Sequence, residues 1–442
     1  MKNYNTDVAI IGGGSAGLAA AIVIKKAGLN ALIIERDREL GGITLQCIHN
    51  GFGIHEFKEE LTGPEFVQRF INEAIKLDIP YKLDTMVIKI EKNKTIYAVS
   101  NKEGLIKIKP KAIILAMGCR ERTRGNINMP GFRPAGIYTA GQAQRFVNVE
   151  GYLPGNTYVI LGSGDIGMIM ARRLTWEGCK VQAVVEIQPY VSGLLRNEVQ
   201  CLEDYDIPLI TSYTVTKIHG RHRVKGVTIS KVDRRFDRII GTDRFIECDT
   251  LLLSVGLIPE NELTQNAGAN ISQNGGPIVD NNLETTIDGI FACGNVLQVH
   301  DLVDLVVAEA KRAGFNAIDY VQNRYGKDLG KKEQIICQPG ENVNYVKPDL
   351  INKSEISKDI IFSLRVKRPD RRILIQFKDE NNKVVYKRKK RYVIPSEMIE
   401  LNLNLEEIGL ISDCNNLIIE VIPQPEVLID NKEEFERWRS DV

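Results

Sequence analysis

The sequence predicts an α/β fold with two units of parallel sheet, followed by an all-β, sandwich-like domain. Short apolar runs alternate with helical patterns up to about Gly326, which is typical of βαβ units. A strand, a glycine-rich loop, a helix and a second strand ending in glutamate occur twice, at residues 7–35 and 158–186. Beyond residue 335, short β-prone runs follow one another without an intervening helix, as in a sandwich or barrel.

The first glycine-rich loop is GGGSAG at residues 12–17, between an apolar strand and a helix-prone segment. Gly12 permits the tight turn, Gly14 lets a pyrophosphate approach the backbone, and Gly17 lets the helix pack on the strand. The helix N-terminus offers free N–H groups to phosphate. Glu35 ends the next strand, where a carboxylate accepts hydrogen bonds from adenosine ribose hydroxyls. These parts, in this order, predict a dinucleotide-binding Rossmann unit.

The second loop, GSGDIG at residues 162–167, follows the strand 158–161, and the next strand ends in Glu186. It predicts a second Rossmann unit. A carboxylate at Glu186 favours a free ribose 2′-hydroxyl and repels a 2′-phosphate. Arg172 and Arg173 lie on the helix after the loop and not just after Glu186, so they are poorly placed to read a 2′-phosphate. We therefore expect NADH, and NADPH less readily.

Two such fingerprints about 150 residues apart resemble the two-dinucleotide-binding-domain flavoproteins, the pyridine nucleotide-disulfide superfamily of thioredoxin and glutathione reductases. Residues 111–118, KAIILAMG, look like that superfamily's strand and A-T-G type turn, with Met117 in place of threonine. Residues 285–295, TTIDGIFACGN, look like its flavin-contacting turn, with Asn295 in place of aspartate. The resemblance implies a glutathione reductase-like fold with FAD on the first unit and NADH on the second.

The resemblance also implies domain bounds and site residues. It places an FAD domain at residues 1–118 and 251–326, an NAD(H) domain at 119–250 and the β-rich domain at 335–442. The helix that begins at Val303 would face the flavin N1–C2 edge with its N-terminus. The expected cofactor-binding residues are Gly12, Gly14, Ser15, Ala16, Gly17, Glu35, Arg36, Gly42, Val87, Ala116, Gly118, Gly162, Gly164, Asp165, Ile166, Glu186, Gly256, Gly294, Asn295, Leu302 and Val303.

A narrower resemblance rests on residues 41–53, 61–65 and 294–304. These segments look like FAD-dependent oxidoreductases that are often encoded beside a glycerol-3-phosphate dehydrogenase-type flavoprotein and a small cysteine-rich protein. Such proteins are related to the flavin subunits of sarcosine, proline and opine oxidases. The resemblance implies these two kinds of protein as partners, and an electron-transfer subunit as the function.

Hydride transfer from NADH C4 to flavin N5 requires no side-chain acid or base, because the cofactors supply the chemistry. The candidate catalytic residues are Cys47, His49 and His300. Cys47 lies where disulfide reductases carry a redox pair, but no second cysteine is near. It is either a redox-active thiol or a small packed residue beside the flavin. His49 shares a face with Cys47 only if the segment is extended, and each histidine, His55 included, is alternatively a structural residue.

Composition excludes several other functions. The chain of 442 residues carries a formal net charge of +1, which gives no global field for nucleic acid or an anionic membrane. No apolar run is long enough for a membrane span, and the N-terminus leads directly into a strand, so we expect no signal peptide. The eight cysteines include no C-x-x-C pair. We expect no metal site and a reducing, cytoplasmic location.

Three functions stay open: an electron-transfer oxidoreductase subunit, a stand-alone NADH oxidase or thiol–disulfide reductase that uses Cys47, and a non-catalytic flavin-bearing scaffold. A homo-oligomer is compatible with each. The polar residues 326–332 predict a linker, and residues 431–442, with Phe435 and Trp438, a short docked helix. The basic run at 387–391 predicts either a docking surface or a lysine-protected edge strand.

Overall fold

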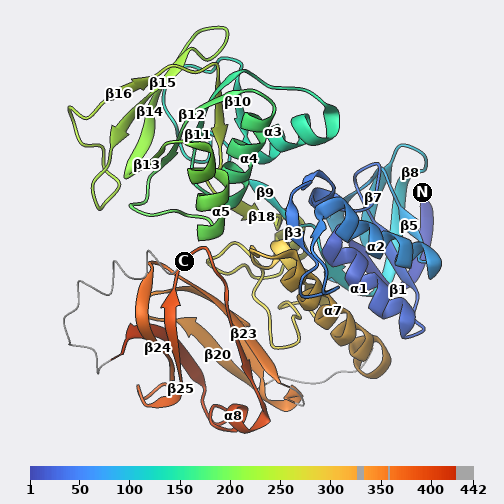
Figure 1. Ribbon diagram of the computed structural model, residues 1–442. Helices are drawn as coiled ribbons and strands as arrows, with labels where there is room; N and C mark the ends of the chain where they lie inside the picture. The colour runs from blue at the N-terminus through green and yellow to red at the C-terminus, as the bar shows by residue number, and fades with distance from the viewer. Residues whose placement is uncertain (326–332, 357–358, 425–442) are drawn as a thin grey trace. The chain divides into compact units, whose positions relative to one another are not determined.

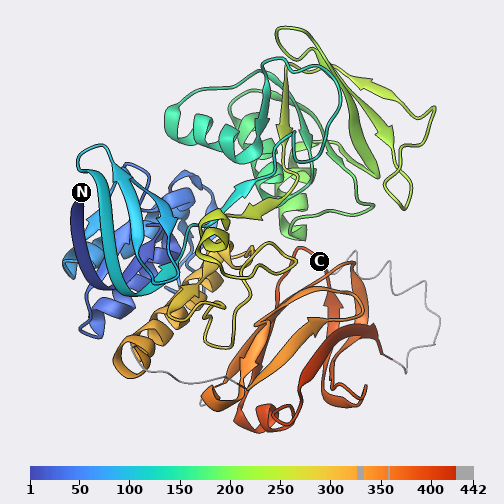
Figure 2. The same cartoon turned by 180° about the vertical axis from the view of Figure 1, so that it is seen from behind.

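The computed structural model describes residues 1–325, 333–356 and 359–424. The chain divides into two compact units, Met1–Leu329 and Gly330–Val442, here called the N-terminal and the C-terminal unit (Figures 1 and 2). The expected linker at 326–332 and the expected helix at 431–442 lie outside the described residues.

The first sheet of the N-terminal unit contains the strand before the first glycine-rich loop, β1 (Lys2–Ile11), which pairs in parallel with β2 and β8. Its spatial order is β5-β2-β1-β8-β7-β6, and β19 pairs with the C-terminal part of β8. The bounds of the other strands are β2 (Ala31–Ile34), β5 (Tyr81–Lys82), β6 (Thr85–Ile90), β7 (Ile96–Ser100), β8 (Gly104–Leu115) and β19 (Ile290–Ala292). The apolar runs at 8–11, 31–34 and 112–115 are fully buried, as the sequence predicts for central parallel strands.

Two helices lie side by side against this sheet in both views, α1 (Ser15–Lys26) and α7 (Val303–Asp319) (Figures 1 and 2). Small residues permit the close approach, since a Cβ built on Gly314 would lie 3.2 Å from the carbonyl oxygen of Ala20. A third helix, α2 (Gly63–Lys76), begins with a capping box of Thr62 and Glu65, which satisfies two free amides at its N-terminus.

The second sheet contains five parallel strands in the order β10-β17-β11-β12-β13. Their bounds are β10 (Ile137–Thr139), β11 (Thr157–Leu161), β12 (Lys180–Glu186), β13 (Leu209–Thr211) and β17 (Thr250–Leu253). One face packs on the helices α3 (Ala140–Arg145), α4 (Asp165–Trp176) and α5 (Leu195–Cys201). The other face packs on the antiparallel strands β14 (Tyr213–His219), β15 (Gly226–Lys231) and β16 (Arg244–Ile246).

The chain passes between the two sheets twice, in the antiparallel strands β9 (Cys119–Glu121) and β18 (Leu257–Pro259). The short helix α6 (Glu262–Ala267) follows. The boundary expected between residues 250 and 251 falls inside β17, because this strand still pairs with β10 and β11 of the second sheet.

The C-terminal unit has a five-stranded sheet, ordered β22-β20-β27-β24-β25, and a three-stranded sheet, ordered β21-β23-β26. A single apolar core contains residues from both sheets. Their bounds are β20 (Gln334–Pro339), β21 (Val343–Lys347), β22 (Leu350–Asn352), β23 (Ile360–Val366), β24 (Asp370–Lys378), β25 (Val384–Val393), β26 (Ile399–Leu403) and β27 (Asn416–Pro423). The β-prone runs of the sequence, at 342–346, 360–366, 372–378, 383–386, 398–403 and 417–422, correspond to β21 and to β23–β27. The sequence missed β20, β22 and the short helix α8 (Leu405–Gly409), but the predicted β-rich class is confirmed.

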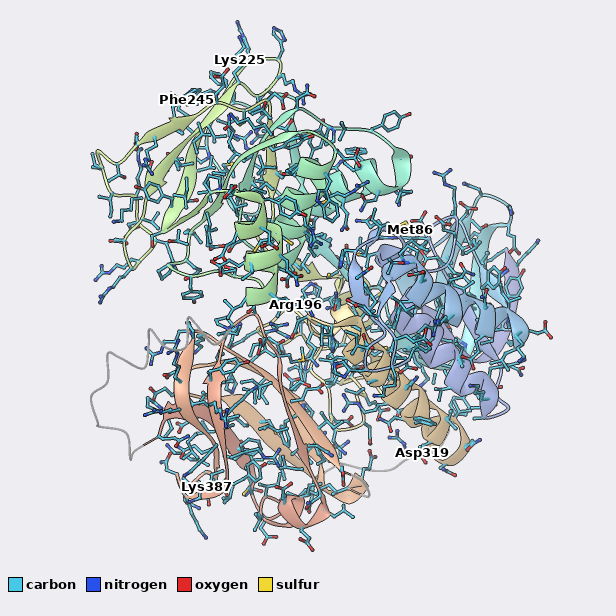
Figure 3. All side chains as sticks on the ribbon, in the orientation of Figure 1. Met86, Arg196, Lys225, Phe245, Asp319 and Lys387 are labelled. Carbon is cyan, nitrogen blue, oxygen red and sulfur yellow. The ribbon has the colours of Figure 1, made fainter. Side chains whose placement is uncertain are left out.

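The basic run at 387–391 lies on β25, which is an edge strand of the five-stranded sheet. Lys387 is exposed on this strand (Figure 3). Charged residues on an edge strand hinder pairing with another chain. The edge-strand interpretation of this run is therefore confirmed. Among the described residues, no helix combines the length and apolarity needed to cross a membrane.

Candidate dinucleotide-binding sites

The first glycine-rich loop is packed tightly on its inner side and open at Gly14. Gly12 has a φ of +105°, and a Cβ built on it would lie 2.3 Å from the carbonyl oxygen of Ala116. A Cβ on Gly17 would lie 1.9 Å from the carbonyl oxygen of Gly12. At Gly14, by contrast, a Cβ would find no atom closer than 3.9 Å. This leaves space beside the N-terminus of α1, where a pyrophosphate can accept hydrogen bonds from backbone amides.

Glu35 is held in a fixed orientation at the end of β2. Its Oε2 accepts a hydrogen bond from the amide of Gly13 at 2.6 Å, and its Oε1 accepts one from the amide of Asp37 at 2.8 Å. A carboxylate has about four lone-pair positions. Two remain for the ribose hydroxyls that this position binds in dinucleotide-binding folds.

The second loop repeats this geometry. A Cβ on Gly162 would lie 2.1 Å from the carbonyl oxygen of Ser254, so the loop also packs tightly on its neighbouring strand. Oε2 of Glu186 accepts hydrogen bonds from the amide and the hydroxyl of Ser163, at 2.8 and 2.7 Å, and Oε1 accepts one from the amide of Gln188 at 2.8 Å. In both units, the glutamate that follows the strand therefore accepts a hydrogen bond from the amide of the second residue of the glycine-rich loop.

The two loops differ at the helix N-terminus. Asp165 is the first residue of α4, and its Oδ1 accepts hydrogen bonds from the amide of Leu194 at 2.8 Å and from Nδ2 of Asn197 at 2.6 Å. The amide of Ser192 donates to Oγ of Ser163 at 2.9 Å. Asp165 thus holds the start of α5 in place. Ile166, the next predicted cofactor-binding residue, lies partly buried in α4.

Several predicted FAD residues meet at the carboxyl ends of β1, β8 and β19. The amide of Ala116 donates to the carbonyl of Ile11, and Gly118 follows with a φ of +74°. A Cβ on Gly294 would lie 3.1 Å from Cβ of Ala16. Ser15 bonds to Thr44 through the two hydroxyls at 2.8 Å. Leu302 and Val303 form the start of α7, beside the same turn, because a Cβ on Gly294 would also lie 3.2 Å from Cγ1 of Val306.

The remaining predicted positions lie around this centre. A Cβ on Gly42 would lie 3.1 Å from Cα of Gly14. Arg36 lines a surface hollow of about 440 Å³ together with Asp84, Met86, Ile88, Val99 and Asn101, and Figure 3 shows Met86 on the N-terminal unit. Val87, between two of these residues, is instead buried in β6, where it pairs with Ala98 of β7. Gly256 lies between β17 and β18 and accepts the amide of Arg122 through its carbonyl.

The three candidate catalytic side chains engage different partners. Sγ of Cys47 donates to the carbonyl of Ile43 at 3.4 Å, and Nδ1 of His49 lies 3.0 Å from the carbonyl oxygen of Asn50. Burial raises the pKa of Cys47 to about 12 and lowers the pKa of His49. His300 packs against Glu309, with its side chain 1% exposed. Among the described residues, no hydrogen bond joins any two of these three side chains.

Two acidic residues of α7 were missed by the sequence reasoning. Asp304 accepts hydrogen bonds from the amides of Gly53, His55 and Glu56, at 3.1, 3.0 and 2.8 Å. Glu309 accepts one from the amide of Gly294 at 2.6 Å. Their position in the sequence could have indicated them, because both are charged residues within the largely apolar run 303–310. A charge that is buried in such a run needs partners.

The donor and acceptor sets fit a bound FAD. Gly14 leaves space for a pyrophosphate, and Glu35 retains acceptor capacity. Nδ1 of His300 and Oε1 of Gln298, next to the turn at Gly294, are buried without a hydrogen-bond partner among the described residues. Because buried polar groups are normally paired, these atoms are available to a bound group or an ordered water.

The family comparison agrees with this geometry. The pyridine nucleotide-disulphide oxidoreductase family matches residues 6–314, well over half of the chain. The chain belongs to this family. Members of the family use FAD and a pyridine nucleotide. The match includes both glycine-rich loops and ends within α7, so the C-terminal unit lies outside it.

Two curated relatives illustrate the range of the family. An alkyl hydroperoxide reductase subunit of Staphylococcus aureus (strain MRSA252) is 27% identical over 324 residues, which are 71% of this chain and 59% of that protein. Thioredoxin reductase of Bacillus subtilis (strain 168) is 26% identical over 295 residues, which are 66% of this chain and 86% of that protein. The chain thus spans less than two thirds of the first of these relatives.

Solved structures share the fold. Thioredoxin reductase from T. acidophilum superposes with a TM-score of 0.59 at 21% identity, over 71% of this chain and 98% of that chain. L-proline dehydrogenase from P. horikoshii superposes with a TM-score of 0.51 at 20% identity, over 74% of this chain and 57% of that chain. The predicted α/β fold with two Rossmann-like domains is therefore confirmed, and these structures show that it resembles the fold of thioredoxin reductase.

The raised pKa of Cys47 leads to a chemical prediction. Because the thiolate is the reactive species, a rise in pKa from 9.0 to about 12 lowers the thiolate population at neutral pH about 1000-fold. The greater nucleophilicity of a more basic thiolate offsets part of this loss. We therefore expect iodoacetamide to alkylate Cys47 in the native chain about 30- to 60-fold more slowly than a free thiol of pKa 9.0, as measured by mass spectrometry of peptides. Alkylation at the rate of a free thiol would show that the environment of Cys47 activates it.

Proposed function

We propose that this chain transfers hydride from NADH to FAD and passes the electrons to a partner protein. The observation that carries the proposal is the repeated geometry at Glu35 and Glu186, each of which accepts the amide of the second loop residue at the end of a parallel strand. Two such units in one chain supply separate sites for two dinucleotides.

In this proposal, FAD binds to the first loop, the turn after β8 and the turn before α7. Gly12, Gly14 and Gly17 provide the close backbone approach, and Glu35 binds the adenosine ribose. The FAD supplies the redox chemistry when bound. The N-terminus of α7, directly after Leu302, orients toward the flavin and stabilises negative charge.

The nicotinamide nucleotide binds to the second unit, at Gly162, Gly164 and Glu186. The carboxylate of Glu186 is 2% exposed and accepts three hydrogen bonds. A negative charge that is fixed at the ribose position repels a 2′-phosphate, so we propose NADH as the substrate, in preference to NADPH.

The cysteines of this chain do not favour a disulfide as the electron acceptor, although the family name refers to disulfides. All eight cysteines are described, and all are free. The thiol of Cys47 lies within weak hydrogen-bonding distance of the carbonyl of Ile43 and of Oε1 of Gln144, and its pKa of about 12 keeps it protonated at neutral pH. We therefore favour a protein acceptor over a disulfide substrate, and propose a partner flavoprotein dehydrogenase and a small cysteine-rich protein as the electron-transfer partners.

Anaerobic titration of the FAD-loaded chain with NADH and with NADPH tests this function. We expect NADH to bleach the flavin absorption band at a lower concentration than NADPH, because only NADPH meets charge repulsion at Glu186. Preference for NADPH would contradict the role of Glu186. Turnover with disulfides that is lost in Cys47→Ser, but kept with an artificial electron acceptor, would favour the thiol–disulfide reductase instead.

A further inference from the structure

The carboxylate of Glu309 is buried in contact with the turn before α7. Its Oε1 accepts the amide of Gly294 at 2.6 Å, and its Oε2 accepts Nε2 of Gln298 at 2.7 Å. Nε2 of His300 lies 3.4 Å from Oε2. All three partners belong to the seven residues 294–300. One helical side chain therefore holds this whole turn.

A buried carboxylate of this kind is costly unless it is paired. Burial by itself pushes the pKa of Glu309 upward, but His300, Arg312 and the amide of Gln298 outweigh it and hold the pKa below its usual range. Glu309 is therefore ionised at neutral pH. The hydrogen bonds that this carboxylate accepts are charge-assisted, and such bonds are shorter and stronger than neutral ones.

The turn that Glu309 holds lies between two helix N-termini. Gly294 has a φ of +71°, and a Cβ there would lie 3.1 Å from Cβ of Ala16 in α1 and 3.2 Å from Cγ1 of Val306 in α7. The amide of His300 donates to Oδ1 of Asn295 at 3.0 Å. Nδ2 of Asn295 in turn donates to Sγ of Cys119 at 3.6 Å. The direction of Asn295 thus depends on a turn whose two ends are fixed by Glu309.

We propose that Glu309 and His300 are positioning residues, which fix the turn at Gly294 and Asn295 against a bound flavin and thereby set its environment. The inference rests on the proposed FAD site, but not on the use of NADH. Both side chains are nearly fully buried, at 1% and 2% exposure, so each acts on a bound flavin by holding the turn and not by donating or accepting the hydride.

The test compares two buried glutamates. Glu284 is a matched control, since its Oε1 accepts the amide of Gly289 at 2.7 Å and its Oε2 pairs with Arg324 at 2.9 Å. Its side chain is as buried as that of Glu309, at 2% exposure. In Glu309→Gln, an amide NH₂ group or a neutral oxygen replaces Oε2, the carboxylate oxygen that faces Nε2 of Gln298 and Nε2 of His300. Glu284→Gln makes the same chemical change in a side chain whose partners, Gly289 and Arg324, lie outside residues 294–300.

We expect both variants to unfold at lower denaturant concentration than the parent chain. Only Glu309→Gln should weaken FAD binding, by about tenfold, and shift the visible flavin spectrum and the flavin midpoint potential. His300→Gln leaves the bonds from Gly294 and Gln298 to Glu309 in place, so it should fold and give a smaller shift in the same properties.

Equal spectra, potentials and FAD affinities in the parent, Glu309→Gln and His300→Gln would overturn the proposal and leave these residues a purely structural role. If Glu309→Gln does not fold, His300→Gln decides the question alone. The midpoint potential is measured by reduction with dithionite and does not require NADH. A flavin that NADH fails to reduce would therefore contradict the proposed function but leave this test intact. A parent chain that takes up no FAD would overturn both.

Discussion

Replacing Gly14 by alanine is expected to weaken FAD binding about 10- to 100-fold while the chain still folds. The backbone of Gly14 has φ −76° and ψ −172°, which any residue adopts. A Cβ there meets no protein atom closer than 3.9 Å, so the folded chain tolerates it. The added methyl group instead occupies the space through which the pyrophosphate approaches the loop, and overpacking of this kind costs about 1–3 kcal/mol.

The affinity of the apoprotein for FAD checks this prediction, and it is measured by the quenching of flavin fluorescence on binding. Gly409→Ala in α8 is the matched control, because a Cβ there also has no neighbour within 4 Å and lies in the C-terminal unit. We expect it to bind FAD like the parent. Parent-like FAD affinity in Gly14→Ala would show that the pyrophosphate does not approach this loop.

Asp304→Ala is expected to lower the free energy of unfolding of the N-terminal unit by about 3 kcal/mol. The carboxylate of Asp304 is 5% exposed and accepts the amides of Gly53, His55 and Glu56. Its removal leaves these amides without their acceptor. The loop is also tied to α7 by the ion pair of Lys311 with Glu56, so we expect it to loosen without full detachment.

Denaturant unfolding gives the change in free energy, and limited proteolysis between residues 50 and 56 reports the loop itself. Asp319→Ala is the control on the same helix, at its C-terminal end (Figure 3). Its carboxylate is 55% exposed and lies 3.6 Å from Nε of Arg324, so its loss should cost less than about 1 kcal/mol. Equal effects of the two substitutions would contradict the anchoring role of Asp304.

The sequence predicts both glycine-rich loops well because their determinants are local. Strand, loop, helix and terminal acid occur within about 30 residues, and the structure places Glu35 and Glu186 at the amides of Gly13 and Ser163. The parallel sheets follow from the same alternation of apolar runs and helices. The edge position of β25 is also predictable, since its lysines and arginines are typical of an exposed edge.

The contacts of the buried acidic residues of α7 could not be predicted in the same way. Asp304 and the amides that it accepts are about 250 residues apart in the chain, and no local pattern joins them. The pKa of Cys47 depends on burial by the tertiary structure, so the sequence left a redox thiol and a packed residue as alternatives. The strand β22 was missed because only three residues, Leu350–Asn352, form it.

The most direct test of the two-site account is the addition of one equivalent of NADH to the FAD-loaded chain without oxygen. We expect the flavin absorption band to be lost in proportion to the NADH added, at a slower rate when the transferred hydrogen at C4 is deuterium. A flavin that stays oxidised in the presence of excess NADH and NADPH would contradict the assignment of the second glycine-rich loop to a nicotinamide nucleotide.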